Sequence, residues 1–347
     1  MRLNLLKDVS WQDSQLLYHA QPRLGREGVN LLAPSTPYVS TGYFQDVEQE
    51  VDLAYCRDSD IPVFRRELGG GAVYLDGDQL FFQLILHRDN PMVPGGGKLG
   101  FYRKFLQAPI EAYRALGIPA EYREVNDIVA HDRKVSGCGA AEIGNYYVLV
   151  GNLIVDFDYE TMSRVLKVPD EKFRDKVYKT ICENLSTISR EIGSAPPRDE
   201  LWSLMVEKFE QMLGPLERRT VVDEAWRAKV DELGERLLTD AWLYRRRPGQ
   251  AGRDVRIRAG VNVAHRMHKA PGGLIRAVLE VREGILASVS LSGDFFLYPE
   301  EKLTELEAVL AGVPLEDVGR VVKGFYAEHG IESPGVTPDD FVRVLVG

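Results

Sequence analysis

Short continuous apolar runs dominate the first part of the chain, a pattern typical of buried β-strands. Residues 72–75 and 80–86 form two such runs, and the turn residues Asp76-Gly77-Asp78 between them predict a β-hairpin. Residues 146–157 form another strand-like run. Between these runs, apolar side chains recur at helical spacing up to Gly117 and predict a helix. They are Leu99, Tyr102, Leu106, Ile110 and Tyr113.

The stretch from residue 160 to residue 243 has helical periodicity instead. Three apolar stripes repeat there, and we expect all three to face the core, as such stripes usually do. The first stripe contains Phe173, Val177, Ile181, Leu185 and Ile188, the second contains Leu201, Leu204, Met205 and Met212, and the third contains Trp226, Val230, Leu233 and Leu237.

A basic segment rich in chain-breaking residues, 245–252, follows, and we expect it to be an exposed, solvated linker. Beyond it, residues 274–281 and the alternating residues 285–291 predict two strands joined by a tight turn, followed by two helices. The helical patterns are carried by Leu303, Leu306 and Leu310, and then by Leu315, Val318, Val322 and Phe325. The sequence therefore predicts an α+β protein with a larger domain over 1–248 and a small α+β domain over 253–347.

The composition is that of an ordinary globular chain, with 347 residues, 44% of them hydrophobic and 27% charged. The net charge of −9 disfavours a broad nucleic-acid-binding face, so small molecules or proteins are the expected partners. Cys56, Cys138 and Cys182 form no Cys-x-x-Cys pair, which argues against disulfides and zinc clusters and favours a reducing compartment. We find no signal-peptide pattern and no apolar run of about 18 residues, so we expect a cytoplasmic protein without a membrane span.

The first glycine cluster is a candidate ligand-binding loop. Gly69-Gly70-Gly71 enters a predicted strand, where the absence of Cβ atoms lets backbone N–H groups approach a ligand closely. Arg65 and Arg66 lie just upstream and could bind a phosphate or carboxylate through forked hydrogen bonds. The alternative is a glycine-rich turn beside a solvated arginine pair.

The second cluster, residues 94–98, ends in Gly-Lys like a phosphate-binding P-loop but fails the pattern. Met92 stands where the P-loop needs a glycine, and Leu99 stands where it needs Ser or Thr. We expect a flexible connection into a helix that starts near Leu99.

The third cluster lies within residues 126–141 and combines polar side chains with small residues. Lys134 opens a small-residue turn, from which its ammonium could reach a bound anion without steric obstruction. Asn126 and Asp127 could hold an adenylate or a Mg²⁺ ion. A turn aspartate and a surface lysine are the alternative interpretation.

Taken in order, these segments resemble the lipoate-protein ligase family, within the wider biotin/lipoate ligase group. The family pattern is an Arg-rich segment, Gly-Gly-Gly, a strand, Asn-Asp, and then Arg-Lys-(Ile/Val)-Ser-Gly. The matching residues are Arg66, Gly69-Gly70-Gly71-Ala72-Val73-Tyr74, Asn126-Asp127 and Arg133-Lys134-Val135-Ser136-Gly137. Residues 38–45 look like the family's first ligand-pocket strand, and residues 166–172 and 184–188 look like its adenylate-binding loop and helix. The part after residue 255 is similar to the accessory domain of bacterial ligases, and the Gly-Arg-Gly-Arg loop of biotin ligases is absent.

The resemblance implies a biotin/lipoate ligase-like mixed sheet with helices, plus a small α+β accessory domain. It also implies an ATP- and Mg²⁺-dependent enzyme that converts lipoate to lipoyl-AMP. The lipoyl group would then pass to a lysine of a lipoyl-domain acceptor, such as a 2-oxoacid dehydrogenase E2 or a glycine cleavage H-type protein. Lys134 would be the catalytic residue, because both steps gather negative charge on oxygen atoms, and Asp127 would be a Mg²⁺ ligand. The expected lipoyl-AMP-binding residues are Arg66, Gly69, Gly70, Gly71, Ala72, Tyr74, Asn126, Asp127, Ser136, Gly137, Cys138, Gly151 and Asn152.

Three positions depart from the family pattern. Leu75 stands where a histidine is usual, Cys138 stands where Ser or Thr is usual, and residues 150–154 replace a His-Gly-(Thr/Ser)-Leu-Leu segment. Cys138 opens an alternative, an octanoyl or lipoyl transferase that uses a cysteine thioester, since Lys134 could lower its thiol pKa. We favour a buried small residue in the place of serine, because relatives that use a cysteine place it on a different loop. A non-catalytic lipoate-binding homologue is a further alternative.

Two features outside these segments have plain interpretations. His265 and His268 could form half of a metal site, but no Cys or carboxylate lies within five residues on either side, so we expect surface histidines in a linker. The arginines at 245–247 could dock an acidic acceptor domain, although a solvated charge run is the better interpretation.

Overall fold

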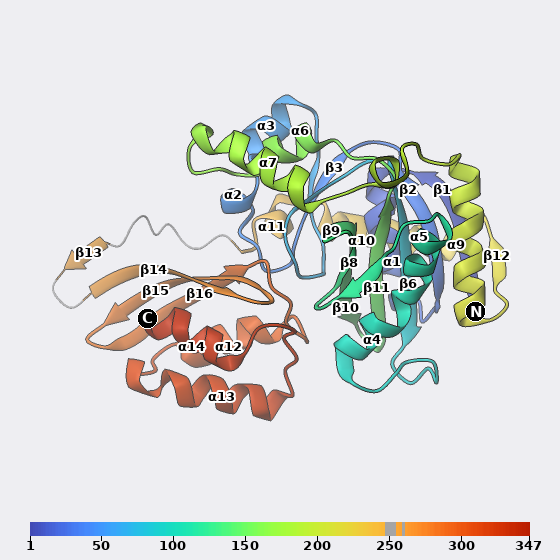
Figure 1. Ribbon diagram of the computed structural model, residues 1–347. Coiled ribbons are helices and arrows are strands. Elements are labelled where there is room, and N and C mark those ends of the chain that lie inside the picture. The colour runs from blue at the N-terminus through green and yellow to red at the C-terminus, as the bar shows by residue number, and fades with distance from the viewer. Residues whose placement is uncertain (247–254, 259–260) are drawn as a thin grey trace. The chain divides into compact units, whose positions relative to one another are not determined.

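The computed structural model describes residues 1–246, 255–258 and 261–347 (Figure 1). The chain divides into two compact units, each made of several segments. The larger unit comprises Met1–Ser40, Val51–Arg65 and Val73–Trp242, and the smaller unit comprises Thr41–Glu50, Arg66–Ala72 and Leu243–Gly347. The predicted domain boundary between residues 248 and 253 lies outside the described residues.

A six-stranded sheet lies at the centre of the larger unit. In spatial order its strands are β10 (Gly139–Ile143), β11 (Tyr146–Ile154), β6 (Gln79–His87), β2 (Gly28–Pro34), β1 (Arg2–Val9) and β12 (Glu217–Arg219). Parallel pairing joins β1 to β2 and to β12, whereas the pairs β2–β6, β6–β11 and β11–β10 are antiparallel. The sheet is therefore mixed, as the resemblance implies, and the predicted fold class is confirmed.

Helices cover both faces of this sheet (Figure 1). One face is covered by α1 (Trp11–Arg23) and α10 (Glu224–Leu237), and the other is covered by α4 (Gly97–Phe105), α5 (Gln107–Ala115) and α9 (Arg198–Leu213). Because both faces are covered, all residues of β6 except the last are buried, which explains its continuous apolar run. A short helix, α11, follows α10 at Asp240–Leu243.

The predicted helix that ends at Gly117 is two successive helices, α4 and α5, which meet at Leu106. Gly117 has a φ of +82°, a conformation that L side chains rarely adopt, so it stops the run as predicted. Helix α4 starts at Gly97, slightly earlier than expected. The predicted strand at 146–157 is confirmed over Tyr146–Ile154.

Two three-stranded sheets flank the central one. Their strands are β4 (Val63–Arg65), β3 (Tyr38–Thr41) and β5 (Val73–Leu75) in the first sheet, and β7 (Glu121–Arg123), β8 (Asp127–Ala130) and β9 (Arg133–Gly137) in the second. The predicted hairpin between residues 72–75 and 80–86 is wrong. Both strands exist, but β5 pairs with β3, and β6 lies between β11 and β2. A local turn signal does not specify a strand's partner, which here comes from a distant part of the chain.

A group of short helices completes the larger unit. They are α3 (Leu53–Asp58), α6 (Tyr159–Val165), the 3₁₀ helix η1 (Glu171–Phe173), α7 (Arg174–Asn184) and α8 (Ile188–Ile192). The first predicted stripe is wrong as core over α7, which has no buried residue, and at the exposed Phe173. Its last member, Ile188 on α8, is buried as predicted. The main neighbours of α7 are α6, η1 and β9, so it lies outside the two helical layers of the sheet. The second and third stripes are confirmed, since Leu201, Met205 and the four residues of the third stripe are buried.

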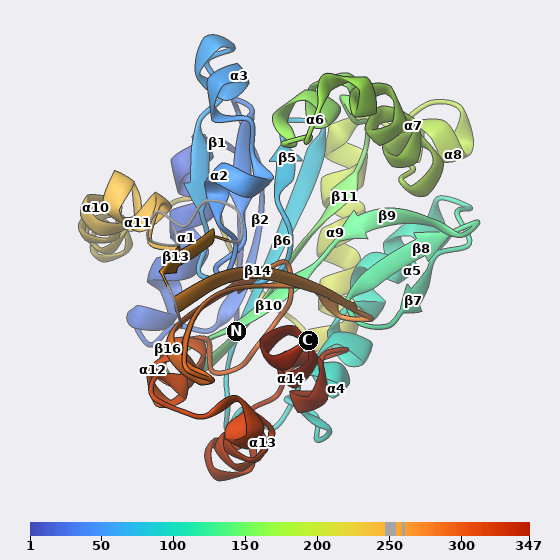
Figure 2. The same cartoon turned by 90° about the vertical axis from the view of Figure 1, so that its left-hand side faces the viewer.

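The smaller unit contains a four-stranded antiparallel sheet with helices along one face (Figure 2). The elements are α2 (Val47–Glu50), β13 (Val255–Arg258), β14 (Val261–Ala270), β15 (Gly273–Arg282), β16 (Ile285–Gly293), α12 (Lys302–Leu310), η2 (Leu315–Asp317), α13 (Val318–His329) and α14 (Pro338–Val346). The predicted strand pair and the two predicted helices are confirmed as β15, β16, α12 and α13. Helix α14 was missed, although Thr337 and Asp340 form a capping box at its start.

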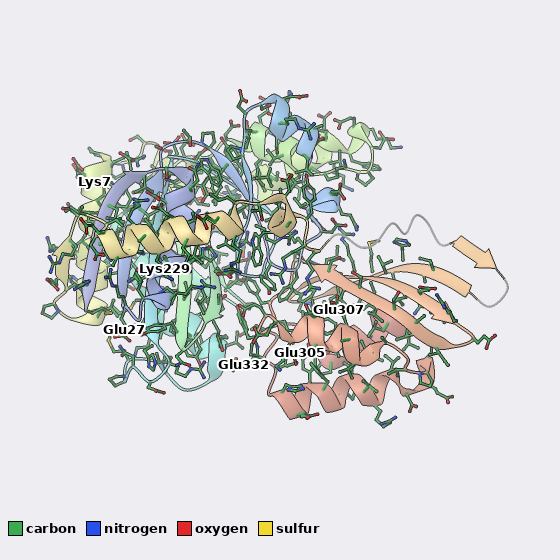
Figure 3. The ribbon with its side chains drawn as sticks, turned by 180° about the vertical axis from the view of Figure 1, so that it is seen from behind. Lys7, Glu27, Lys229, Glu305, Glu307 and Glu332 are labelled. Atoms are coloured by element: carbon green, nitrogen blue, oxygen red, sulfur yellow. The ribbon has the colours of Figure 1, made fainter. Side chains whose placement is uncertain are left out.

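Arg246 contradicts the prediction of a solvated arginine run. Its side chain is only 7% exposed, and Nη1 contacts both carboxylate oxygens of Glu307 on α12, at 2.9 and 3.0 Å. Glu307 (labelled in Figure 3) also accepts a hydrogen bond from the Leu291 amide on β16 at 2.6 Å. The arginine is buried because a carboxylate is there to pair with it, a partner that local sequence does not reveal.

The two histidines lie on strand β14 and not in a linker, which corrects that expectation. His265 is exposed, whereas His268 is half-buried, and its Nε2 lies 2.8 Å from Asp340 Oδ1 on α14. Residues three apart on a strand point to opposite faces, so the pair cannot share one metal ion. In the described part of the chain, no helix is long and apolar enough to cross a membrane.

Candidate active site

The β8–β9 hairpin carries the central residue of the predicted site. Ala130 pairs with Arg133, and the two turn residues His131 and Asp132 both have positive φ angles, +48° and +62°. Two such residues form the tight turn that matches the twist of antiparallel strands, and His and Asp tolerate this conformation better than most residues. The hairpin therefore holds Lys134 at a fixed point, the second residue of β9.

Lys134 and Asp127 form an ion pair across this hairpin. The Lys134 Nζ and Asp127 Oδ1 atoms lie 2.6 Å apart, and the two side chains are 35% and 25% exposed. Arg123 adds a second positive group, 3.6 Å from the other oxygen of Asp127. Because the lysine side chain keeps about a third of its surface open, its ammonium can also reach a bound anion.

A chain of buried polar side chains lies beneath β9. The Gly137 amide donates to Asn152 Oδ1 at 2.9 Å, and Ser136 Oγ lies 3.5 Å from the same oxygen. Asn152 Nδ2 donates to Gln79 Oε1 at 2.7 Å, and Gln79 Nε2 donates to the Tyr74 carbonyl at 3.2 Å. Hydrogen bonds through Gln79 therefore connect four predicted site residues, which are Tyr74, Ser136, Gly137 and Asn152.

Gln79 is not among the predicted site residues. A signal was available, because Gln79 is a polar residue at the start of a mainly apolar run, and buried polar groups are nearly always hydrogen-bonded.

Asn126 and Gly151 complete the group by backbone and packing contacts. Asn126 Nδ2 donates to the Cys138 carbonyl. A Cβ atom on Gly151 would lie 2.3 Å from Phe82 Cζ and 3.0 Å from Cys138 Sγ. The glycine therefore leaves room for the Phe82 ring and the Cys138 sulfur.

Cys138 is a buried, neutral thiol. Burial raises its pKa to about 12 and outweighs the Ser136 hydrogen bond and the Lys134 charge, both of which act to lower it. The lowered pKa that a thioester-forming nucleophile would need is therefore contradicted. The interpretation of Cys138 as a buried small residue in the place of serine fits its environment.

The glycine loop and Arg66 belong to the smaller unit, as does Ala72, and form a second group of predicted site residues. Arg66 Nη2 donates to the Gly69 and Gly71 carbonyls, both at 2.8 Å, so the arginine stabilises the loop itself. Gly70 has a φ of +88°, and its amide donates to the Phe295 carbonyl at 3.1 Å.

Arg65 is fully buried, which excludes the alternative of a solvated arginine pair. The 94–98 segment likewise does not present its lysine to solvent. Lys98 is buried, forms an ion pair with Glu142, and lies 4.2 Å from the centre of the Tyr147 ring. This supports the conclusion that the segment is not a P-loop, but the lysine is held in place and not flexible as expected.

Few of the described side chains are placed to bind a metal ion. Over residues 1–246 and the described parts beyond, no three His, Cys, Asp or Glu side chains gather in a way that could hold a metal ion. Asp127 remains the predicted ligand, with one of its oxygens already paired to Lys134.

Known proteins similar to this chain include lipoate–protein ligases and, over smaller shares of the chain, octanoyltransferases. Residues 9–210 match the sequence profile of the lipoyl protein ligase A/B catalytic domain. A lipoate–protein ligase of Streptococcus pyogenes is 29% identical over 288 residues, which cover 81% of this chain and 78% of that protein. The structure of a bipartite lipoate protein ligase from Thermoplasma acidophilum, solved with its E2 lipoyl domain, matches with a TM-score of 0.62 at 26% identity, covering 72% of this chain and 98% of that one. The structure of lipoate-protein ligase A bound with ATP matches with a TM-score of 0.60 at 25% identity, covering 70% and 98%.

Proposed function

The chain belongs to the lipoyl protein ligase A/B family, and on this premise we propose that it is an ATP-dependent lipoate–protein ligase. The observation that carries the proposal is the Lys134–Asp127 pair on the β8–β9 hairpin, inside the region that matches the family. The S. pyogenes relative, which is a lipoate–protein ligase, and the related ligase that was solved with ATP support the same activity.

In the first step, a carboxylate oxygen of lipoate attacks the α-phosphorus of ATP. The bond between this phosphorus and the bridging oxygen breaks, which gives lipoyl-AMP and pyrophosphate. Negative charge builds on the phosphate oxygens, and the Lys134 ammonium stabilises it. Asp127 holds the ammonium in place on the hairpin, so little reorganisation is needed when the charge develops.

In the second step, the amine of an acceptor lysine attacks the acyl carbon of lipoyl-AMP. The acyl–oxygen bond breaks, AMP leaves, and the nitrogen loses a proton as the amide forms. Lys134 again faces charge on oxygen, on the acyl carbonyl and on the departing phosphate. The enzyme needs no covalent nucleophile, which is consistent with a neutral Cys138 thiol.

The acceptor is a lipoyl-domain protein, either a 2-oxoacid dehydrogenase E2 or a glycine cleavage H-type protein. The archaeal relative that was solved with its E2 lipoyl domain supports this class. Asp127 would be the protein's ligand to a Mg²⁺ ion that accompanies ATP, and one carboxylate would suffice because Mg²⁺ usually keeps phosphate and water ligands.

The proposed binding residues fall into two groups. Arg66, the glycine loop and Ala72 come from the smaller unit, and the residues around Lys134 come from the larger one. In the larger unit, the polar chain through Asn152 and Gln79 supports a binding role, because it holds the Gly137 amide and the Ser136 hydroxyl in one arrangement. A cytoplasmic location fits the cysteines, all three of which are free thiols.

Lipoate-dependent exchange of labelled pyrophosphate into ATP tests the proposal on the wild type, Lys134→Ala and Cys138→Ser. We expect exchange in the wild type and in Cys138→Ser, and a loss of about 10²- to 10³-fold in Lys134→Ala. Lipoate binding without exchange would indicate a non-catalytic homologue. Acyl transfer from a carrier protein that requires Cys138 would establish the transferase instead.

A further inference from the structure

A carboxylate with little exposed surface contacts the Lys134 hairpin and has no part in the chemistry described above. The Glu191 side chain, on α8, is only 6% exposed. Its Oε2 atom lies 2.8 Å from His131 Nδ1, in the turn of the β8–β9 hairpin. Its Oε1 atom accepts a hydrogen bond from Ser186 Oγ. One carboxylate therefore contacts two separate points near the site.

Ser186 connects Glu191 to the backbone of Lys134. The Ser186 amide donates to the Lys134 carbonyl at 2.9 Å, and Leu185 forms a parallel bridge with Lys134. These two contacts hold the backbone of Lys134, the residue that carries the ammonium group. Glu191 reaches it through Ser186 and through the turn residue His131.

Helix α8 is itself firmly attached to the larger unit, so Glu191 is a fixed reference point. Thr187 Oγ1 caps the helix by accepting from the Arg190 amide at 3.1 Å. The Ser189 amide donates to the Val155 carbonyl at 3.0 Å, just after strand β11. Ile188 is completely buried in the main core.

The Glu191 carboxylate is kept ionised by its partners. Burial alone acts to raise its pKa, but the hydrogen bonds from Ser186 and His131 outweigh burial and lower the pKa below its usual value. A charged carboxylate with so little exposed surface costs desolvation free energy, which its contacts with His131 and Ser186 must offset.

We infer that Glu191 is a positioning residue for Lys134: with Ser186 and His131 it clamps the β8–β9 hairpin so that the lysine stays at one distance from the reacting phosphate. Asp127 restrains the ammonium group, and Glu191 restrains the backbone that carries it. The inference rests on the proposed ligase function for its kinetic consequence, but the clamp itself is a structural statement that can be tested separately.

The first test is amide hydrogen exchange of the full-length wild type, Glu191→Ala and Glu191→Gln. Glu191→Ala should speed exchange in peptides from residues 127–137, with little change in β1, β2 and β6. Glu191→Gln keeps an acceptor oxygen for Ser186 and should lie between the two. Glu27→Gln is the matched control, because Glu27 (labelled in Figure 3) also accepts two hydrogen bonds, from the His87 amide and Asn90 Nδ2, on a different turn. Unchanged exchange at 127–137 in Glu191→Ala would overturn the clamp.

The second test is a double-mutant cycle on pyrophosphate exchange. Glu191→Ala should lower kcat by about ten- to a hundredfold, because a small misplacement of a catalytic group has an effect of this size, while KM for ATP and lipoate stays within about twofold. In a Lys134→Ala background, the same substitution should change kcat by less than about twofold, since the group that it positions is gone.

An equal loss of kcat in both backgrounds would show that Glu191 acts without Lys134 and would refute the inference. An inactive wild type would instead refute the proposed function, and the hydrogen-exchange result would still decide the clamp.

Discussion

The Arg246–Glu307 pair in the smaller unit gives a prediction about stability that is independent of function. The two side chains are 7% and 13% exposed, so water screens their charges poorly. Glu307→Ala leaves the Arg246 guanidinium buried without its counter-charge and removes the acceptor of the Leu291 amide. Breaking a buried pair in this way costs about 3–5 kcal/mol of unfolding free energy.

Urea unfolding and calorimetry of the full-length chain measure this cost. For a unit of this size, each kcal/mol lowers Tm by about 3–6 °C, so the transition of the smaller unit should fall by at least about 9 °C. Replacing both partners, Arg246→Met with Glu307→Met, removes the buried charge altogether and should recover most of the loss.

Glu305→Ala on the same helix is the matched control. Glu305 (labelled beside Glu307 in Figure 3) pairs with Lys302 at 2.7 Å but is nearly half exposed, so its loss should cost at most about 1 kcal/mol. The reasoning would be refuted if Glu307→Ala cost no more than Glu305→Ala, or if the double variant were as unstable as Glu307→Ala.

Three further predictions concern the larger unit. Burial raises the pKa of Asp76 to about 6, so the folded protein binds this proton more tightly than the unfolded chain does. The protonated carboxyl therefore adds to the unfolding free energy below about pH 4, and this contribution is lost as the pH rises through 6. In urea titrations, the unfolding free energy of the wild type should fall over this range by about 2 kcal/mol relative to that of Asp76→Asn. If the two unfolding free energies changed with pH in parallel, a raised pKa of Asp76 would be contradicted. Gly151→Ala places a Cβ 2.3 Å from Phe82 Cζ and should cost about 1–3 kcal/mol by thermal unfolding, most of which Phe82→Leu should restore; a neutral Gly151→Ala would argue against the packing role. In native protein at pH 8, iodoacetamide should alkylate the partly exposed Cys182 well before the buried Cys138, as peptide mass spectrometry can show, and the reverse order would revive the thioester alternative.

Local sequence patterns predicted the parts of the fold that depend on local physics. The stripe of α10 and the strand pair β15–β16 follow from periodicity and turn chemistry, which act over a few residues. Strand partners did not follow, because β5 pairs with β3 and not with its neighbour β6. The α7 stripe was also misassigned, since periodicity describes a helix's own face and not whether another element covers it.

The candidate site likewise contains some residues that local sequence could predict and others that it could not. Lys134 and Asp127 could be singled out because a lysine near small residues and an Asn-Asp pair form a recognisable motif, and the structure places their charged groups 2.6 Å apart. Glu191 could not be singled out, because its importance depends on contacts with a hairpin that ends more than 50 residues earlier in the sequence. Arg246 was misjudged for the related reason that its partner lies on a distant helix.

The most direct test of the account is transfer of the lipoyl group itself. Purified protein, lipoate, MgATP and an unmodified lipoyl domain are combined, and the domain is analysed by intact mass and peptide mapping. We predict a lipoyl amide on one acceptor lysine, formed only with ATP and accompanied by AMP and pyrophosphate. The product should be retained in Cys138→Ser and nearly abolished in Lys134→Ala. A modification that forms without ATP, or that persists undiminished in Lys134→Ala, would contradict it.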